Sequence, residues 1–136
     1  MSDLIKEVEV GGVTYVVQPI DAQTQYKILQ KLSRYGVAHL VSGMIKAETE
    51  KNKAGAMKLA YTQALLAIIQ NMPEAEQDFC ITNALKKTAV AGETEAVGIS
   101  MFTGRIAEYV LLGAKAIGVQ LGDFSCFQSL INESMA

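Results

Sequence analysis

The chain opens with a segment in which apolar and polar residues alternate on both sides of a glycine pair, Gly11-Gly12. Such alternation is typical of half-buried β-strands, and glycines in a two-residue turn allow the positive φ angles of a tight hairpin. Pro19 has no amide hydrogen to donate, so it ends the second strand. The pattern therefore predicts a β-hairpin over residues 3–19. Because a lone hairpin is only marginally stable in water, it must pack on helices or on another chain.

After Asp21, the spacing of apolar residues changes to the period of an α-helix, and Asp21 itself is a suitable N-cap. This first helix presents one apolar stripe, made of Tyr26, Leu29 and Leu32 with Ile28 beside it. Gly36 is placed to stop or bend the helix. Helical patterns continue over most of residues 21–134. We therefore predict a mainly α fold, a small helical bundle with an N-terminal β-hairpin, in one domain of 136 residues.

Two segments between the helices are expected to be loops. Residues 46–55 are charged and carry no large apolar side chain, which predicts a flexible surface loop. Residues 88–98 are rich in small residues and predict a second loop. Between these segments, residues 56–72 are apolar nearly all round the helix, which indicates central burial. Pro73 can open the following helix, because the first helical turn tolerates proline.

The last long helix, residues 102–124, is apolar for most of its length but carries Arg105 in its first turn, where the helix dipole disfavours a cation. Thr103 is the expected N-cap. Glu108, one turn later, offsets the dipole only weakly, so we expect an acid from another element to hold the arginine. Arg105 is interpreted as a structural residue that clamps the helix to its neighbours.

Two glycines inside this helix, Gly113 and Gly118, indicate close packing against other helices. Asp123 can cap a final short helix that contains Phe124 and Phe127. The apolar content of the chain is high, at 50% of residues, and the mean hydropathy is +0.21. This excess favours a surface meant for a partner or for a second copy of the chain.

Charge and hydropathy argue against two classes of partner. The formal net charge of −2 gives no basic footprint, so nucleic acid is not an expected partner. The most apolar run, residues 106–121, is too short to span a membrane and is interrupted by Glu108 and Lys115. The first ten residues hold acids where a signal peptide has basic residues. We therefore expect no membrane partner.

Residues that could carry chemistry are few. His39 is the single histidine, and together with Cys80 and Cys126 it lacks the paired spacing of a zinc site. The two cysteines lie far apart in apolar helical contexts, which favours buried reduced thiols over the alternative of a single disulfide. Glu93 and Glu95 lie in an expected loop, where no apolar wall would shift a carboxyl pKa. No nucleophile, metal or phosphate-binding motif is found. We predict no catalytic residue, no metal site, no cofactor and no enzyme activity.

The order of these elements resembles the tail assembly chaperones of long-tailed bacteriophages. The resemblance rests on the opening, VGGVTYVVQPIDAQTQYKILQKLSRYG, and on a later block, MFTGRIAEYVLLGAKAIGVQLGDF. The matching positions are Gly12, Tyr15, Pro19, Ala22, Leu29, Leu32 and Gly36, then Phe102, Gly104, Arg105, Glu108, Asp123 and Phe124. Where the family pattern has an asparagine-aromatic pair before the final acid, this chain has residues 120–122.

The resemblance implies a function and a set of partners. Proteins of this family bind the tape-measure protein, a long helical chain that aggregates readily, and keep it soluble while tail-tube subunits polymerise around it. They act in the host cell cytoplasm and are absent from the mature virion. The tape-measure protein is therefore the expected partner, and the tail-tube protein and a homo-oligomer are further candidates. No nucleotide site is seen, so holding is expected to proceed without ATP.

Candidate site residues follow from this expectation. Adaptable apolar surface is expected at Phe124, Phe127, Met101 and Met44, because methionine side chains repack on varied targets. Structural roles are assigned to Arg105, Glu108, Gly104, Gly12 and Pro19. Two other hypotheses stay open. The chain could be a structural virion protein, such as a tail-completion or head–tail connector component, or a small enzyme with a pocket around His39 or Glu108.

Overall fold

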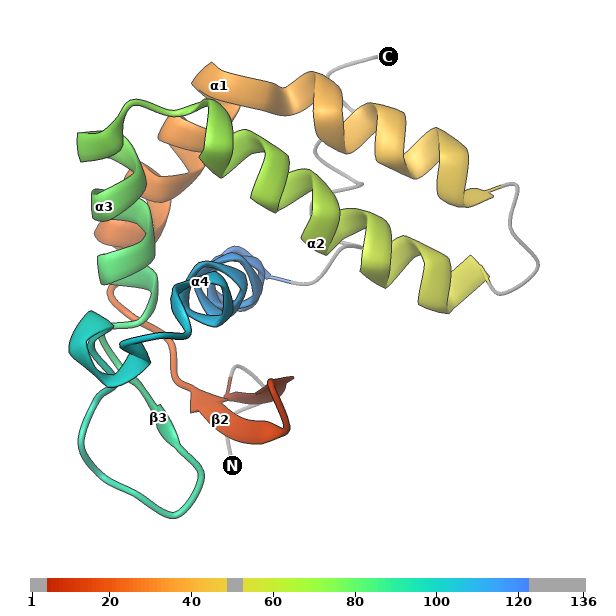
Figure 1. Cartoon of the computed structure of the whole chain (residues 1–136). Coiled ribbons are helices and arrows are strands. Elements are labelled where there is room, and N and C mark those ends of the chain that lie inside the picture. Colours follow the sequence, from red (N-terminus) through yellow and green to blue (C-terminus); the bar gives the residue numbers. More distant parts are fainter. Residues whose placement is uncertain (1–4, 49–52, 123–136) are drawn as a thin grey trace.

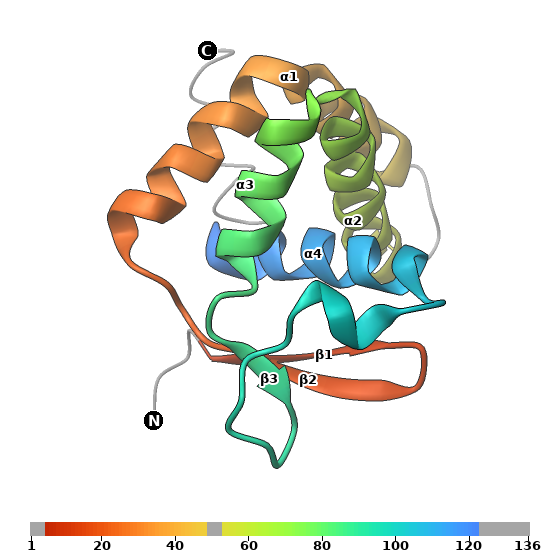
Figure 2. The same cartoon turned by 60° about the vertical axis from the view of Figure 1, so that its left-hand side comes forward.

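The computed structural model describes residues 5–48 and 53–122, with the side chains of residues 5–36 and 60–122. Its helices are α1 (Ala22–Glu48), α2 (Lys53–Asn71), α3 (Glu74–Ala84), the 3₁₀ helix η1 (Ile99–Phe102) and α4 (Ile106–Gln120). Helices α1, α2 and α3 lie on one side of α4, and a small β-sheet lies on the other side (Figure 1, Figure 2). The mainly helical prediction is confirmed, and α4 is the element that joins the two sides.

The predicted hairpin is present as β1 (Lys6–Val10) and β2 (Val13–Val17), which pair antiparallel. Its turn is the glycine pair, with φ angles of 59° at Gly11 and 79° at Gly12. These left-handed angles are easy for glycine and costly for other residues, which explains why the sequence has two glycines here. Alternate side chains of β2 are buried towards α4, including Tyr15 and Val17. The inward face of the hairpin therefore belongs to the core.

The loop predicted over residues 88–98 contains a third strand, which corrects the expectation of a hairpin alone. Strand β3 (Thr88–Val90) pairs antiparallel with β2, and the strand order is β1-β2-β3. An isolated bridge between Ala89 and Ala96 continues this pairing into the loop. Three residues give too weak a local signal to be read as a strand. Only the free edge of β2, about 70 residues earlier in the chain, makes this segment extended.

The start of α1 matches the predicted cap. Asp21 Oδ2 accepts hydrogen bonds from the backbone N–H of Thr24, at 2.9 Å, and from its hydroxyl, at 2.7 Å. These two hydrogen bonds hold the pKa of Asp21 below its ordinary value. At Gly36 the backbone leaves the helical conformation, with φ 174° and ψ 39°, and α1 bends there (Figure 1). The predicted bend is confirmed.

The apolar stripe predicted on α1 is partly wrong. Ile28 and Leu32 are fully buried, whereas the side chain of Tyr26 is 60% exposed and Leu29 is half-buried. The buried face follows a spacing of four residues that begins at Ile28. Tyr26 lies two residues before Ile28, on the opposite side of the helix. The buried side of α1 is therefore centred on Ile28 and Leu32, and Tyr26 does not belong to it.

The charged loop predicted over residues 46–55 is wrong at both of its ends, because α1 extends to Glu48 and α2 begins at Lys53. Residues 49–52 lie outside the described part of the chain. Helix α2 is buried along one broad side, through Leu65, Ile68 and Ile69. Helix α3 follows Pro73 as predicted, and it carries the acidic residues Glu74 and Glu76 in its first turn.

Helix α4 is buried through most of its length, and Leu112 and Ile117 have no exposed surface. Its glycines let neighbouring helices approach closely. A Cβ atom at Gly113 would lie 2.8 Å from Ile81 Cγ2 of α3, and one at Gly118 would lie 3.3 Å from the Tyr61 ring of α2. The predicted role of both glycines in close packing is confirmed. Among the described residues, none of the helices combines the length and the apolarity needed to cross a lipid bilayer.

Candidate partner-binding surface

The start of α4 differs from the sequence-based prediction. The chain first forms η1, and α4 begins only at Ile106, with Arg105 in the N-cap position. Gly104 separates the two helices with a φ of 80°, a left-handed angle that glycine adopts easily. Thr103, the predicted cap, instead donates its hydroxyl to the carbonyl oxygen of Ser100 at 3.1 Å. The long helix predicted from residue 102 is therefore broken at Gly104.

Arg105 points back towards η1 and away from the first-turn amides of α4. Its Nη2 donates to the carbonyl oxygen of Met101 at 2.9 Å, and its guanidinium carbon lies 5.2 Å from the centroid of the Phe102 ring. Glu108 Oε2 lies 3.8 Å from Nη1. The expected acid from another element is not found among the described residues, and the acid beside Arg105 is Glu108 of the same helix. Arg105 thus ties the end of η1 to the beginning of α4.

Phe102 anchors this junction in the core. Its ring is buried, with its centroid 6.3 Å from that of Tyr15 on β2 and 5.4 Å from that of Tyr109 on α4. Such aromatic pairs add to the stability gained from burial. Since Phe102 points inward from a short 3₁₀ helix, the residues on either side of it are left on the surface.

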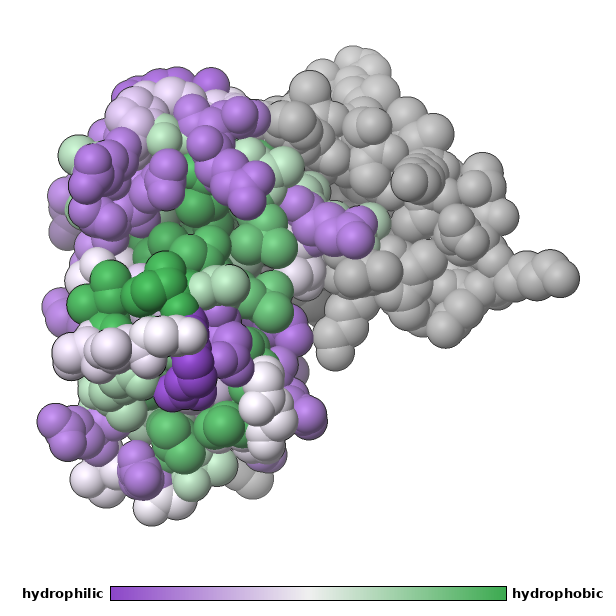
Figure 3. Space-filling model, in the orientation of Figure 1, coloured by the Kyte–Doolittle hydropathy of each residue, from purple (hydrophilic) through white to green (hydrophobic). Residues whose placement is uncertain are grey.

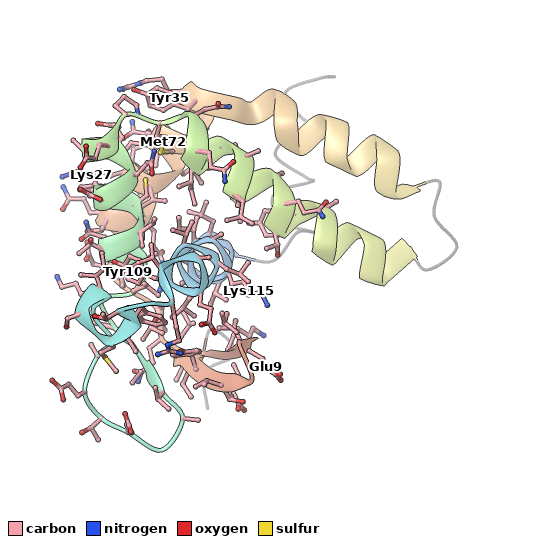
Figure 4. All side chains as sticks on the ribbon, in the orientation of Figure 1. Glu9, Lys27, Tyr35, Met72, Tyr109 and Lys115 are labelled. Atoms are coloured by element: carbon pink, nitrogen blue, oxygen red, sulfur yellow. The ribbon has the colours of Figure 1, made fainter. Side chains whose placement is uncertain are left out.

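Polar contacts fix the hairpin to α4. The carboxylate of Glu108 lies against Gly11, so that a Cβ atom at this position would overlap it. Lys115 Nζ donates to the carbonyl oxygen of Glu9 at 2.8 Å, and Figure 4 shows these two residues on neighbouring elements. Gly11 is therefore required by its φ angle, whereas the Glu108 carboxylate, at the end of a flexible side chain, can move aside for a Cβ atom.

The buried side-chain amide of Gln120 forms several hydrogen bonds in the core, a role that was not predicted from the sequence. Its Oε1 accepts the N–H of Ile20 at 2.9 Å, and its Nε2 donates to the carbonyl oxygen of Gln18 at 2.8 Å. The same amide also meets Gln25 and the carbonyl oxygen of Ala84. Gln120 lies three and four residues after the buried Ile117 and Ala116, so helical spacing alone could have placed it inside.

Three apolar side chains around the junction are exposed, and together we call them the η1–α4 surface. They are Ile99 at 58%, Met101 at 44% and Ile106 at 50% of their full accessibility. Figure 3 shows an apolar area on this face, near the position that η1 and the first turn of α4 take in Figure 1. Apolar side chains gathered on a rigidly anchored turn are typical of protein-binding surfaces.

A comparison with protein families decides the identity of the chain. A family model described as "Phage tail assembly chaperone protein, TAC" matches residues 11–132. The chain is a member of the phage tail assembly chaperone family. No curated protein and no solved structure matches it. The matched region begins at the hairpin turn and contains both blocks on which the resemblance rested, except for Val10 at the start of the first, so that resemblance is confirmed.

The structure places some of the predicted binding residues of this chaperone and leaves others outside its description. Met101 is exposed on the η1–α4 surface, and its contact with a partner stays a prediction. Ile99 and Ile106 were not predicted, because Ile99 lies before the predicted helix and Ile106 lies in its apolar run, where the break at Gly104 is not apparent. Met44 lies in α1, but its side chain is outside the described residues, as are Phe124 and Phe127.

Among the predicted structural residues, Gly12 forms the hairpin turn and Pro19 is half-buried in the connection between β2 and α1. Gly104, Arg105 and Glu108 together shape the junction between η1 and α4. Each of the five predicted structural residues thus lies at a turn or a junction between elements.

The described part of this chaperone holds no group of three or more histidine, cysteine, aspartate and glutamate side chains that could bind a metal ion. Glu93 and Glu95 are exposed. Cys80 is buried, and burial raises the pKa of its thiol to about 11, which keeps it protonated and unreactive at neutral pH. The side chain of His39 and the whole of Cys126 lie outside the described residues.

Proposed function

We propose that this chaperone binds the tape-measure protein and keeps it soluble while the tail tube assembles. The observation that carries the proposal is the family match over residues 11–132. The exposed η1–α4 surface supports it, because a holding chaperone needs apolar side chains in water before its client arrives. Met101 adds a flexible, polarisable side chain that can repack against different client segments.

The proposed mechanism is holding by mass action. Each chaperone covers one apolar stretch of the client, and many copies along one long chain make aggregation slower than tube assembly. Holding of this kind needs no ATP and no covalent chemistry, so we propose that the protein is not an enzyme. The proposed place of action is the host cytoplasm, and the proposed further partners are the tail-tube protein and a second copy of the chain.

Co-expression with the tape-measure protein tests this function. We expect the wild-type chaperone to raise the fraction of tape-measure protein recovered in the supernatant. A triple variant, Ile99→Ser, Met101→Ser and Ile106→Ser, should lose this effect, whereas the melting temperature should change little because these side chains are exposed. The matched control is Tyr26→Ser, which removes a side chain of similar exposure from α1. Equal recovery with the triple variant and with wild type would exclude the η1–α4 surface as the binding site.

A second variant compares this surface with the segment predicted from the sequence. Phe124→Ser with Phe127→Ser should reduce client recovery if the segment after α4 meets the client. Loss in both variants would extend the binding site from η1–α4 to that segment. If wild-type chaperone fails to change client solubility at all, the proposed function is wrong, whatever the variants do.

The proposed absence from the virion separates a chaperone from a structural protein. Mass spectrometry of purified particles should detect the tail-tube protein but not this chain. Detection of the chain at a fixed ratio to the tail-tube protein would favour the alternative of a tail-completion or connector component.

A further inference from the structure

Among the described residues, strand β1 is an open edge of the sheet. The strand order there is β1-β2-β3, so β1 has a described strand neighbour on one side only, while β3 is extended by the bridge between Ala89 and Ala96. An open edge presents backbone donors and acceptors that another strand can use. The question is which groups of β1 point outward.

The register of the hairpin determines which backbone groups of β1 point away from β2. Val10 and Val13 flank the two-residue turn and exchange hydrogen bonds with each other, so the backbone groups of Glu9 and Glu7 point away from β2. One hydrogen bond on each side of the hairpin supports this alternation. Thr14, paired with Glu9, uses its carbonyl to accept the N–H of Ala91 beyond the other edge of β2, and the Glu9 carbonyl accepts Lys115 Nζ.

Lys115 therefore occupies the place of a donor on an incoming strand. Its Nζ lies 2.8 Å from the carbonyl oxygen of Glu9, as a strand amide would. Within the described part of the chain, no bond is formed by the N–H of Glu9 or by either backbone group of Glu7. The carbonyl oxygen of Glu9 is thus already bonded, whereas the N–H of Glu9 and the N–H and carbonyl of Glu7 remain for a partner.

The charges beside this edge indicate the chemistry of that partner. The side chains of Glu7 and Glu9 are exposed on the outer face of the sheet, and neither takes part in the two ion pairs of the described residues. A second copy aligned so that its helices lie on the same side of the sheet would bring glutamates opposite glutamates, which is unfavourable. A strand with lysine or arginine at alternate positions would pair with both.

We propose that the β1 edge binds an extended, basic segment of a partner protein by strand addition. The segment forms backbone hydrogen bonds with Glu7 and Glu9 and places basic side chains opposite their carboxylates. This goes beyond the proposed function, because it uses backbone pairing at the sheet edge and neither the η1–α4 surface nor an apolar helix.

A synthetic peptide tests the proposal on the full chain. The probe is a seven-residue peptide with blocked ends in which lysine and valine alternate, titrated into ¹⁵N-labelled protein. We expect amide shifts centred on residues 6–10 and slower hydrogen exchange at Glu7 and Glu9. The same peptide with glutamate in place of lysine should bind far more weakly, and added salt should weaken the lysine peptide.

Two variants separate backbone pairing from charge. Glu7→Ala removes the carboxylate and keeps the outward N–H, whereas Glu7→Pro removes both and leaves the hydrogen bonds to β2 in place. We expect Glu7→Pro to bind the peptide about tenfold more weakly than Glu7→Ala, as the loss of one hydrogen bond implies. Equal affinity of the two variants would overturn the proposal.

A chemical control avoids any effect of proline on folding. N-methylation of the peptide amides that face β1 should abolish binding to wild-type protein, and methylation of the alternate amides should leave it intact. Binding that ignores the methylation pattern, or no binding of the lysine peptide at all, would refute strand addition. Concentration-dependent shifts of residues 6–10 without peptide would overturn it in favour of a second copy as the occupant.

Discussion

Gln120 is a single polar side chain on which β2, α1 and the end of α3 depend. Its amide satisfies the buried N–H of Ile20 and the carbonyl oxygens of Gln18 and Ala84. A buried polar group without a partner costs about 1–3 kcal/mol, so one side chain that satisfies several groups contributes more than its own surface area suggests.

We predict that Gln120→Leu lowers the free energy of unfolding by about 2–4 kcal/mol, because the leucine fills the space but leaves the bonded backbone groups unpaired. Urea denaturation measures this. Gln30→Leu, at an exposed position of α1, is the control and should change stability by less than about 0.5 kcal/mol. A small effect at Gln120 would mean that water replaces the amide.

Cys80 gives the protein a pH dependence at alkaline pH. Burial raises the pKa of the folded thiol from 9.0 to about 11, so the folded state keeps a proton that the unfolded state releases. The stabilisation is complete below pH 9 and is lost as the pH rises from 9 towards 11, by about 3 kcal/mol in total.

The measurement is the free energy of unfolding between pH 8 and pH 11, with reductant present. Because alkaline pH can change stability in other ways as well, the reference is Cys80→Ala, which removes the thiol alone. The difference in stability between wild type and Cys80→Ala should shrink as the pH rises. Parallel curves would show that the buried thiol ionises as easily as a free one.

At the scale of elements, the two glycines of α4 are expected to respond differently to the same substitution. A methyl group at Gly113 would lie 2.8 Å from the branched Ile81 side chain, which must move. At Gly118 the nearest atom is 3.3 Å away, at the end of the Tyr61 ring. Alanine also favours the helix over glycine by about 1 kcal/mol, which works in the opposite direction.

We therefore predict that Gly113→Ala lowers the free energy of unfolding by about 1–2 kcal/mol, while Gly118→Ala changes it by less than about 1 kcal/mol. Thermal denaturation of the two variants, side by side, measures the difference, and each variant is the control for the other. If both are stabilised equally, helix propensity outweighs the close contact with Ile81.

The elements that could be predicted from the sequence are those with local signals. The glycine turn of the hairpin, the Asp21 cap and the bend at Gly36 each depend on residues next to one another. The elements that were missed depend on distant contacts. Strand β3 exists because β2 lies beside it, and the break at Gly104 was hidden in an apolar run that continues through it.

In the candidate site, too, residues with a local signal could be predicted and residues that depend on distant contacts could not. Met101 was predicted to be exposed because its type suits an adaptable surface, and it is exposed. Ile99 and Ile106 were not predicted, since the sequence does not reveal that Phe102 takes the buried position between them. The Arg105 contacts were also missed in part, because they depend on how η1 turns back towards α4.

At the scale of the whole molecule, the first elements of the chain pack on one of its last. We predict that a fragment of residues 1–104, which lacks α4, leaves the hairpin without its packing partner and unfolded. The NMR spectrum of the fragment should show no dispersed amide signals for residues 6–17, whereas the full chain should. Native-like signals in the fragment would mean that the hairpin is held by α1, α2 and α3 alone.

The contacts between the hairpin region and α4 also set an order of events during synthesis. Lys115 with Glu9, and Gln120 with Gln18 and Ile20, join residues that are 100–106 positions apart. A ribosome that adds about 5–20 residues per second needs roughly 5–20 seconds to cover that distance, whereas a hairpin forms in microseconds. The newly made hairpin therefore lacks its contacts with Lys115 and Gln120 until α4 emerges, and the native packing of the sheet on α4 is completed only near the end of translation.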